Sequence, residues 1–381
     1  MPAGALMASL LALVPHSVSG HVRHSVPPVH VAVGFGVDTA RSPQREIFAL
    51  YRSYLAHLDD ATRPNPFWSE AEQQRWQVFD LVRGYVYQGF TNFTVVHLAP
   101  AAGLDSTYLI RALVSSVGDS TRDVKPLALY RLYAIREAGR WVLANALPRL
   151  TRTWHRETIK SVTFVYPPGR RFARQRAEAS AAFVDSLARA FELSPPATID
   201  YYFTDDLIDT FRAMGLDFFP IGSDTVGGRA DAVNGQVFVG SSTNGEGYRH
   251  ELAHVVLQPL VGRGRTAAAI LEGLMTWTGG SAALDFGHLV PGLKAYVQAH
   301  PQLTLEVALT TPPPREGTLD VLYDGAAVLC AMVYEKGRVA GIRELVSAGP
   351  HLDDALRTAA RLLGVRREDL GRLWRDRVLT Y

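Results

Sequence analysis

The sequence predicts an α+β protein of two units. The N-terminal unit combines helices with an antiparallel sheet, and the C-terminal unit has a small sheet followed by helices. Apolar residues recur at helical spacing between residues 42 and 82, then alternate at strand spacing between residues 93 and 147. From residue 266 onward the pattern is almost entirely helical. With 381 residues, the chain is long enough to bury two substantial cores.

The first unit is predicted to cover residues 40–155 and to fold independently. Ser42 and Pro43 open a helix, and Ser69 with Glu72 forms a capping box that opens a second helix. A two-residue hairpin joins the last two of the strands that follow. These strands are expected at 93–99, 107–117, 127–137 and 140–147. The element order resembles the cone-shaped NTF2-like fold, which is common as an accessory module.

The second unit is predicted to cover residues 156–381, after a boundary in residues 148–160 where Pro148 ends the sheet. Strands are expected at 161–168, 198–203 and 235–240, with a long helix at 171–192. Further helices are expected at 318–336, 339–347, 352–363 and 367–379. A sheet-containing half and a helical half therefore flank the stretch from 247 to 280.

This central stretch begins with GYRHELAHVVL, which places His250 and His254 four residues apart. In a helix, residues i and i+4 lie on one face, so both imidazoles can bind a single ion. Glu251 lies about 100° around the helix from His250. It is too far round to join the pair, but near enough to act on a water molecule beside the metal. The alternative is an amphipathic surface helix with unrelated histidines.

A third ligand is expected from TAAAILEGLMTWTGG, because catalytic zinc usually has three protein ligands. Glu272 is the one acid in this apolar helix, and an unpaired carboxylate there costs several kcal/mol unless something compensates it. A metal would do so; the alternative is that Glu272 faces solvent or an arginine. Asn244 and Thr266 are the expected N-caps of the two helices, and Pro259 and Gly279-Gly280 their ends.

HELAH, followed eighteen residues after His254 by Glu272 in an EGL context, resembles the gluzincin (MA-type) zinc metallopeptidases, the thermolysin and aminopeptidase superfamily. The resemblance covers roughly residues 160–381 and implies a zincin-type domain. In it His250, His254 and Glu272 bind one Zn²⁺, and Glu251 is the general base. Thermolysin-like enzymes brace a zinc histidine with an Asp at the position of Thr276. The GAMEN element of the aminopeptidase branch is also absent, so exopeptidase specificity is not implied.

The resemblance extends to two further segments. The strand at 235–240 corresponds to one at the edge of the gluzincin cleft, where an extended substrate can pair. The segment YDGAA is similar to the helix that carries the catalytic tyrosine in aminopeptidase-like gluzincins, which makes Tyr323 the candidate oxyanion donor. The alternative is a core tyrosine beside Leu322 and Ala326. Gly325 costs about 1 kcal/mol in a helix relative to Ala, and we expect it to allow close approach to another backbone.

The composition of the chain narrows the classes of partner that we expect it to bind. The 39 basic and 37 acidic residues nearly balance, so no basic footprint indicates nucleic acid. The single Cys330 is expected to be a buried small hydrophobe and leaves the redox compartment open.

The N-terminal segment ALMASLLALV has the length of a signal-peptide core, although no Lys or Arg precedes it. Residues 1–20 are therefore a possible signal peptide of a secreted or periplasmic protein. A cytoplasmic protein with a disordered start is the alternative. Ten apolar residues cannot span a bilayer, and no other segment is predicted to be transmembrane.

The sequence as a whole predicts a zinc-dependent peptidase that acts on a peptide or protein substrate, with Glu251 as general base and Tyr323 beside the metal as oxyanion donor. A non-catalytic binding protein that retains the zincin scaffold is the alternative from another class. A third interpretation places the main small-molecule site in the N-terminal unit, and an apolar cavity with converging polar groups there would favour it. Cleavage preference and oligomeric state stay open. Three other histidines, His288, His300 and His351, are expected at the surface or at helix caps.

Overall fold

The computed structural model describes residues 29–58, 63–86, 92–117, 123–220, 226–262, 264–281, 284–310 and 318–381. The signal-like segment predicted at residues 1–20 lies outside these ranges. The chain forms two compact units. The N-terminal unit extends to Trp154 and also takes in Ile208–Asp224, and the C-terminal unit comprises His155–Leu207 and Thr225–Tyr381. Each unit is described by itself.

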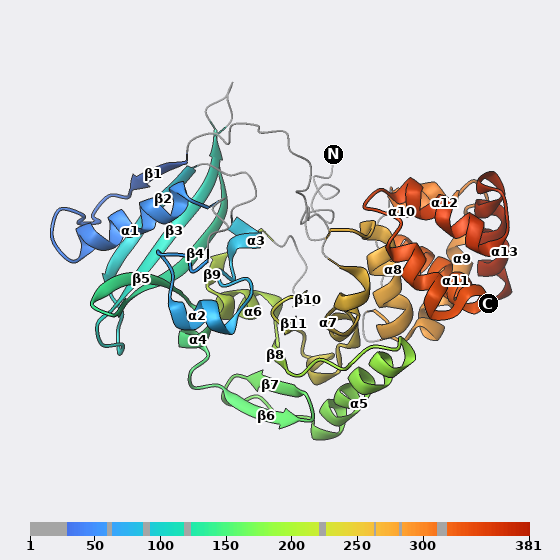
Figure 1. Cartoon of the computed structure of the whole chain (residues 1–381), viewed down its shortest axis with the longest axis horizontal. Helices are drawn as coiled ribbons and strands as arrows, with labels where there is room; N and C mark the ends of the chain where they lie inside the picture. The colour runs from blue at the N-terminus through green and yellow to red at the C-terminus, as the bar shows by residue number, and fades with distance from the viewer. Residues whose placement is uncertain are drawn as a thin grey trace. The chain divides into compact units, whose positions relative to one another are not determined.

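The N-terminal unit is built on a six-stranded sheet, coloured blue to green in Figure 1. Its strands are ordered β1-β2-β3-β4-β5, with β1 parallel to β2 and the other neighbours antiparallel. The bounds are His30–Val33 for β1, Asn92–Pro100 for β2, Thr107–Val117 for β3, Val124–Glu137 for β4 and Arg140–Asn145 for β5. The four long strands predicted from the sequence are all present, and the short β1 was not foreseen.

Helices complete this unit. They are α1 (Gln44–Ala56), α2 (Glu70–Arg75), α3 (Arg83–Val86) and α4 (Leu147–Leu150). The apolar side of α1, including Ile47 and Tyr51, is fully buried. Half of the predicted capping box is present: the Ser69 side chain accepts a hydrogen bond from the Glu72 backbone N–H at the start of α2. The other half is absent, because the Ser69 backbone N–H donates to the Leu143 carbonyl oxygen and the Glu72 carboxylate accepts from Asn145 and Arg149 instead.

The N-terminal unit also contains residues that the sequence assigned to the second unit. Strand β9 (Leu216–Phe218), which follows α6 (Leu207–Met214), pairs antiparallel with β4. Asp217 forms ion pairs with Arg111 and Arg131, which stand on β3 and β4. A three-residue strand has no detectable periodicity, so the sequence pattern could not reveal this pairing. A fragment of residues 40–155 would lack β9 and would leave both arginines without this carboxylate.

The C-terminal unit contains a five-stranded sheet ordered β10-β11-β8-β7-β6. Its strands are β6 (His155–Ile159), β7 (Val162–Tyr166), β8 (Ile199–Thr204), β10 (Gly227–Asp231) and β11 (Gln236–Gly240). The central strands β7, β8 and β11 run parallel, and β10 pairs antiparallel with β11. The predicted strand at 235–240 exists as β11, but the expectation that an extended substrate pairs with it is wrong, because both of its sides are already paired. It lies between two neighbours, and the edge strand is β10.

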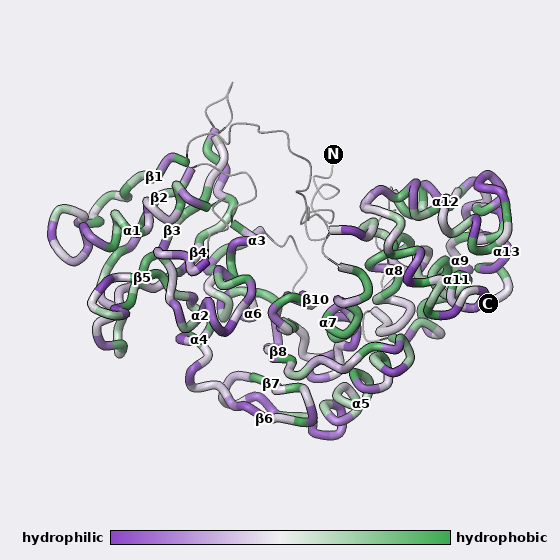
Figure 2. Tube along the Cα trace, viewed as in Figure 1, coloured by the Kyte–Doolittle hydropathy of each residue, from purple (hydrophilic) through white to green (hydrophobic). Residues whose placement is uncertain are grey.

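The helices of this unit are α5 (Arg174–Ala190), α7 (Arg249–Val261), α8 (Ala268–Gly279), α9 (Phe286–Ala299), α10 (Leu305–Thr310), α11 (Val321–Val346), α12 (Leu352–Leu363) and α13 (Leu370–Thr380). Two 3₁₀ turns, η1 (Gly245–Gly247) and η2 (Arg367–Asp369), precede α7 and α13. Hydrophobic residues run along α8 and the first part of α11, as Figure 2 shows. Sheet and helices share one hydrophobic core.

Several helix ends differ from those expected. Tyr248, not Asn244, is the N-cap of α7, and Pro259 lies inside that helix, which ends at the glycine cap Gly262. The last turn tolerates the proline because only one backbone hydrogen bond is lost near the end of the helix. Thr266 does not cap α8; its hydroxyl donates to the carbonyls of Val261 and Val346.

Two other helix boundaries agree with the sequence. Gly280 caps the C-terminus of α8, as the Gly279-Gly280 pair predicted. Arg338 interrupts α11 with a φ of 50°, at the break predicted between residues 336 and 339. Among the described residues, no helix is long and apolar enough to cross a membrane.

Candidate metal centre

The three side chains predicted to bind a metal converge on one point. Glu272 Oε2 lies 3.1 Å from His250 Nε2 and 3.6 Å from His254 Nε2. Ligand atoms of all three residues lie within 4.8 Å of one another. In a tetrahedral zinc site with bonds of about 2.1 Å, ligand atoms are about 3.4 Å apart. The donor types and their spacing therefore fit one zinc ion, with a fourth position left for a water molecule or substrate.

Close helix packing brings the ligands together. A Cβ atom at Gly279, at the end of α8, would lie only 2.8 Å from the Arg249 carbonyl oxygen and 2.9 Å from His250 Cα. A Cβ atom at Gly273 would lie 2.4 Å from Ala326 Cβ on α11. Glycine is therefore required at both contacts of α8, one with the start of α7 and one with α11. These contacts hold Glu272 against the histidines of α7.

A contact of the second ring nitrogen also fixes the orientation of the His250 ring. His250 Nδ1 lies 2.9 Å from the Gly280 carbonyl oxygen. Because a carbonyl only accepts, Nδ1 donates, which leaves Nε2 as the nitrogen that can bind a metal once it has lost its own proton. Gly280 has a φ of 80°, and a Cβ atom there would lie 2.1 Å from the Leu284 carbonyl oxygen. This backbone carbonyl supplies the support that a carboxylate at the position of Thr276 would otherwise provide.

The charges at this centre shift the pKa values of His250 and Glu272. Burial lowers the pKa of His250, but the hydrogen bond with Glu272 and the charges of Glu251 and Glu272 outweigh this and raise that pKa to about 9. Burial raises the pKa of Glu272, yet His254 and His250 together hold it well below its usual range. Glu272 is therefore a carboxylate at neutral pH. Zinc binding requires neutral imidazoles, so it would release a proton from His250.

Glu251 is buried beside this centre, with 6% of its surface exposed. Burial, reinforced by the charge of Glu272, raises its pKa, while His250, His254 and Arg229 oppose that shift. Its side chain lies against the edge strand β10, where a Cβ atom at Gly228 would come within 2.7 Å of Glu251 Cγ. The same Cβ atom would lie 2.4 Å from the Tyr248 ring. The glycine in β10 therefore leaves the space that Glu251 occupies.

Replacing Gly228 by alanine tests this packing. The added methyl group must displace Glu251 or Tyr248. If Glu251 is the general base that the sequence predicts, a misplacement of about 1 Å reduces the rate about 10²-fold. Zinc content should be unchanged, since the atoms nearest to the added methyl group belong to Tyr248 and Glu251 and not to the three predicted ligands. Peptide hydrolysis and zinc content of Gly228→Ala, measured side by side, check this. Wild-type turnover in that variant would contradict the position assigned to Glu251.

One buried hydroxyl holds the turn that precedes α7. Tyr201 on β8 donates to the Gly245 carbonyl oxygen at 2.7 Å and accepts from the Tyr248 backbone N–H at 3.1 Å. The two bonds fix both sides of η1. They therefore set where α7 starts and how His250 enters the centre. The sequence did not single out Tyr201, because an isolated tyrosine in a strand has no distinguishing pattern.

Tyr323 lies beside the ligands, near the start of α11. Its ring stacks on the His250 ring with 5.9 Å between centroids and 3° between planes. The Asp320 side chain caps this helix by accepting from the Tyr323 backbone N–H. The structure thus brings Tyr323 to the candidate centre, while its role as oxyanion donor stays a prediction.

Gly325 does not have the expected role. A Cβ atom there would meet the indole ring of Trp374 at 3.3 Å, not another backbone, and Trp374 Nε1 donates to the Gly325 carbonyl oxygen at 2.9 Å. The close backbone approach of α11 is made by its neighbour Ala326, opposite Gly273. Cys330 is fully buried, as expected.

The other histidines considered from the sequence lie outside the metal-ligand cluster. His288 is exposed and contacts Asp285 at the start of α9, while His300 caps the C-terminus of that helix and stacks on Tyr296. His351 is the N-cap residue of α12. Their predicted surface or capping positions are confirmed.

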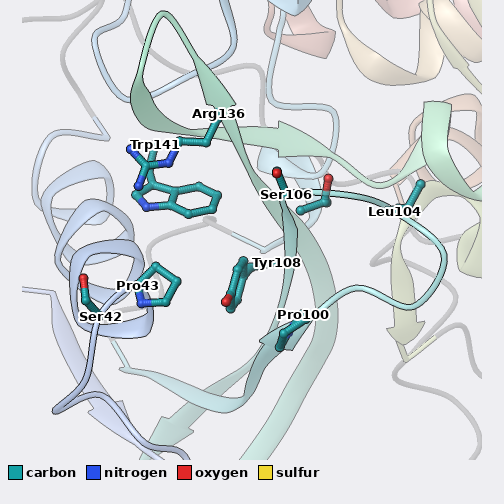
Figure 3. A pocket seen from close by; sticks show the side chains of 9 residues that line it. Ser42, Pro43, Pro100, Leu104, Ser106, Tyr108, Arg136 and Trp141 are labelled. Carbon is teal, nitrogen blue, oxygen red and sulfur yellow. The ribbon is translucent and has the colours of Figure 1, made fainter.

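The N-terminal unit contains a hollow of about 510 Å³, shown in Figure 3. Tyr108 and Trp141 form one corner, with ring planes at 82°, and the Arg136 guanidinium lies over the Trp141 ring. Its polar groups mostly bond to the protein: Arg136 Nη1 to the Gly139 carbonyl, Ser42 Oγ to Glu46. The interpretation that the main small-molecule site lies in this unit required an apolar cavity on which free polar groups converge. This hollow therefore does not favour that interpretation.

Known proteins resemble this chain only distantly. No protein-family model and no curated protein matches the chain. Among solved structures, similar ones include an M1 zinc metallopeptidase from Deinococcus radiodurans, a Glu→Ala variant bound to a Tyr-Ser-Ala substrate. It has a TM-score of 0.36 and 15% identity, over 74% of this chain and 62% of that one.

Two further structures of M1 zinc metallopeptidases are similar to the same extent. A two-domain variant bound to L-tryptophan has a TM-score of 0.34 and 15% identity. A structure of the enzyme from Deinococcus radiodurans has a TM-score of 0.30 and 12% identity. Each match covers 74% of this chain and 63% of the other, so the chain spans a little under two thirds of their length. Likeness at this level does not assign an activity to this chain.

Proposed function

We propose that this protein is a zinc-dependent peptidase that hydrolyses peptide bonds in a peptide or protein substrate. One observation carries the proposal. His250 Nε2, His254 Nε2 and Glu272 Oε2 meet at zinc-ligand spacing, and the buried Glu251 carboxylate stands next to them in the sequence and in space. Three protein ligands with an open fourth position are typical of catalytic rather than structural zinc.

The roles of the residues follow from their positions. His250, His254 and Glu272 would hold the zinc ion, which would supply a Lewis acid for the substrate carbonyl and for the attacking water. Glu251 accepts the proton of the attacking water and then donates it to the leaving amine nitrogen. Gly280, through its carbonyl oxygen, keeps the His250 ring in the orientation and tautomer that ligation needs.

The substrate backbone has an obvious partner in the edge strand β10. Among the described residues its outer side has no neighbouring strand, and its Gly228 lies against Glu251. An extended peptide paired with β10 would pass beside the proposed general base. This replaces β11, which the sequence had suggested for that role.

A non-catalytic binding protein is the competing interpretation, and one screen separates the two. The zinc-loaded protein is incubated with a mixed peptide library, and the products are identified by mass spectrometry. Cleavage that disappears on chelation and returns with zinc supports the peptidase. Zinc-loaded protein that leaves every peptide intact would support the binding role.

Tyr323→Phe is expected to lower the rate less than the loss of the general base does. Removal of one oxyanion donor costs roughly 10²–10³-fold in kcat, while zinc binding and the ring stack on His250 remain. Steady-state kinetics on a verified substrate check the change, with zinc content measured in parallel. An unchanged kcat would show that Tyr323 only packs beside His250.

A further inference from the structure

A second hollow lies directly beside the metal helix. Its volume is about 370 Å³, and its walls come from α5, from η1 and the start of α7, and from Ser281, Leu284 and Asp285 between α8 and α9. Tyr248, Arg249 and Gly279 belong to the wall. Tyr248 and Arg249 directly precede His250 in the chain, and Gly279 packs on the His250 backbone. A group bound in this hollow is therefore held next to a metal ligand.

Two arginines, Arg176 and Arg249, line this hollow, and packing contacts hold each of them in place. The Arg176 stem lies over Gly247, where a Cβ atom would meet Arg176 Cδ at 3.0 Å, and its Nη1 donates to the carbonyls of Thr243 and Asn244. Arg249 lies over the Phe183 ring at 5.6 Å. Within the described part of the chain, neither arginine has a carboxylate partner.

One opposing charge faces the same hollow. Asp285 lines it, but its Oδ1 accepts from the His288 backbone N–H at 3.1 Å and lies 2.8 Å from His288 Nδ1. These bonds with His288 hold the pKa of Asp285 below its ordinary value, so it is ionised. The Glu246 carboxylate of η1 is buried and accepts from the Ala173 backbone N–H. Among the residues that line the hollow, two arginines stand against one carboxylate, so the lining carries a net positive charge. A substrate carboxylate complements that charge, and an arginine fork binds carboxylates well.

We propose that this hollow binds a carboxylate of the peptide substrate, with Arg176 and Arg249 as specificity-determining residues. The carboxylate is either an Asp or Glu side chain or the peptide's C-terminus. This inference rests on the proposed peptidase function, because polypeptide substrates offer carboxylates as their anionic groups. The enzyme should accordingly prefer acidic peptides, or peptides with a free C-terminus, over neutral peptides of the same shape.

Calorimetry on the zinc-loaded, full-length Glu251→Gln protein tests the binding without cleavage. The probes are an acetylated and amidated alanine peptide with one glutamate, its glutamine counterpart, and an acetylated alanine peptide with a free C-terminus. One of the two carboxylate-bearing probes should bind on the order of 10-fold more tightly than the glutamine peptide. Whichever probe does so identifies the source of the carboxylate.

Three further substitutions, each made in the Glu251→Gln protein, show which residues cause the preference for a carboxylate. Arg176→Gln should abolish the preference. Asp285→Asn should strengthen it, since asparagine still caps α9. Arg174→Gln, a matched change on the same helix outside the hollow, should leave it intact. Equal affinity for all three probes, or a preference that survives Arg176→Gln, would overturn the proposal. If the preference is present but the wild-type protein cleaves no peptide, the peptidase function fails and the carboxylate site stands.

Discussion

Glu251→Gln is expected to keep a full complement of zinc and to lose nearly all hydrolysis. Glutamine preserves the size of the side chain and still forms hydrogen bonds, but it cannot accept the proton of the attacking water. General base catalysis commonly contributes 10²–10⁴-fold, so kcat/KM should fall by at least that factor. Steady-state kinetics and metal analysis of the same preparation measure both quantities.

The control for this change is Glu178→Gln on α5, which removes an exposed carboxylate paired with Arg174. Its activity should match that of the wild type. The activity of Tyr323→Phe should lie between that of the control and that of Glu251→Gln. Turnover of Glu251→Gln at the wild-type level on a verified substrate would refute the proposed mechanism.

His254→Ala is expected to lose zinc and, with it, activity. Removing partners that only support a metal ligand typically costs 10–100-fold in affinity. The loss of one of three ligands should exceed this, so zinc affinity should drop more than about 100-fold. It should also leave the Glu272 carboxylate with a single imidazole partner in a buried position, which destabilises the metal-free protein.

Competitive zinc titration with a chromophoric chelator measures the affinity. His288→Ala is the matched control, because His288 is exposed and lies outside the metal-ligand cluster. It should bind zinc like the wild type. Full zinc occupancy in His254→Ala would mean that the metal is held elsewhere.

The core of the site could be predicted because its geometry is local. Two histidines four residues apart face the same way in any α-helix, so HELAH determines their relative position without knowledge of the fold. Glu272 stood out because an acid in an apolar helix needs a compensating partner. The structure places all three where those two considerations require.

The supporting groups could not be predicted, because they depend on contacts between distant segments. The Gly280 carbonyl that braces His250 is a backbone atom, and every residue has one. The space that Gly228 leaves for Glu251 exists only once β10 lies over α7. Both residues stand in Gly-Gly pairs, at 227–228 and 279–280, and the second pair was interpreted only as a helix end.

The fold, like the site, has parts that could be predicted from the sequence and parts that could not. The four long strands of the first sheet carry many alternating residues and were predicted closely. Strand β9 has three residues and depends on the Asp217 ion pairs with β3 and β4, so nothing local marks it. The edge position of β10 also follows from strand order, which the sequence of a single strand does not contain.

A crystal structure of the zinc-loaded protein with diffraction data at the zinc absorption edge tests the central claim most directly. We predict one anomalous peak, bonded to His250 Nε2, His254 Nε2 and the Glu272 carboxylate at about 2.0–2.2 Å, with Glu251 near the metal but not bound to it. A peak at any other set of residues, or zinc-loaded protein with no peak between α7 and α8, would contradict the account.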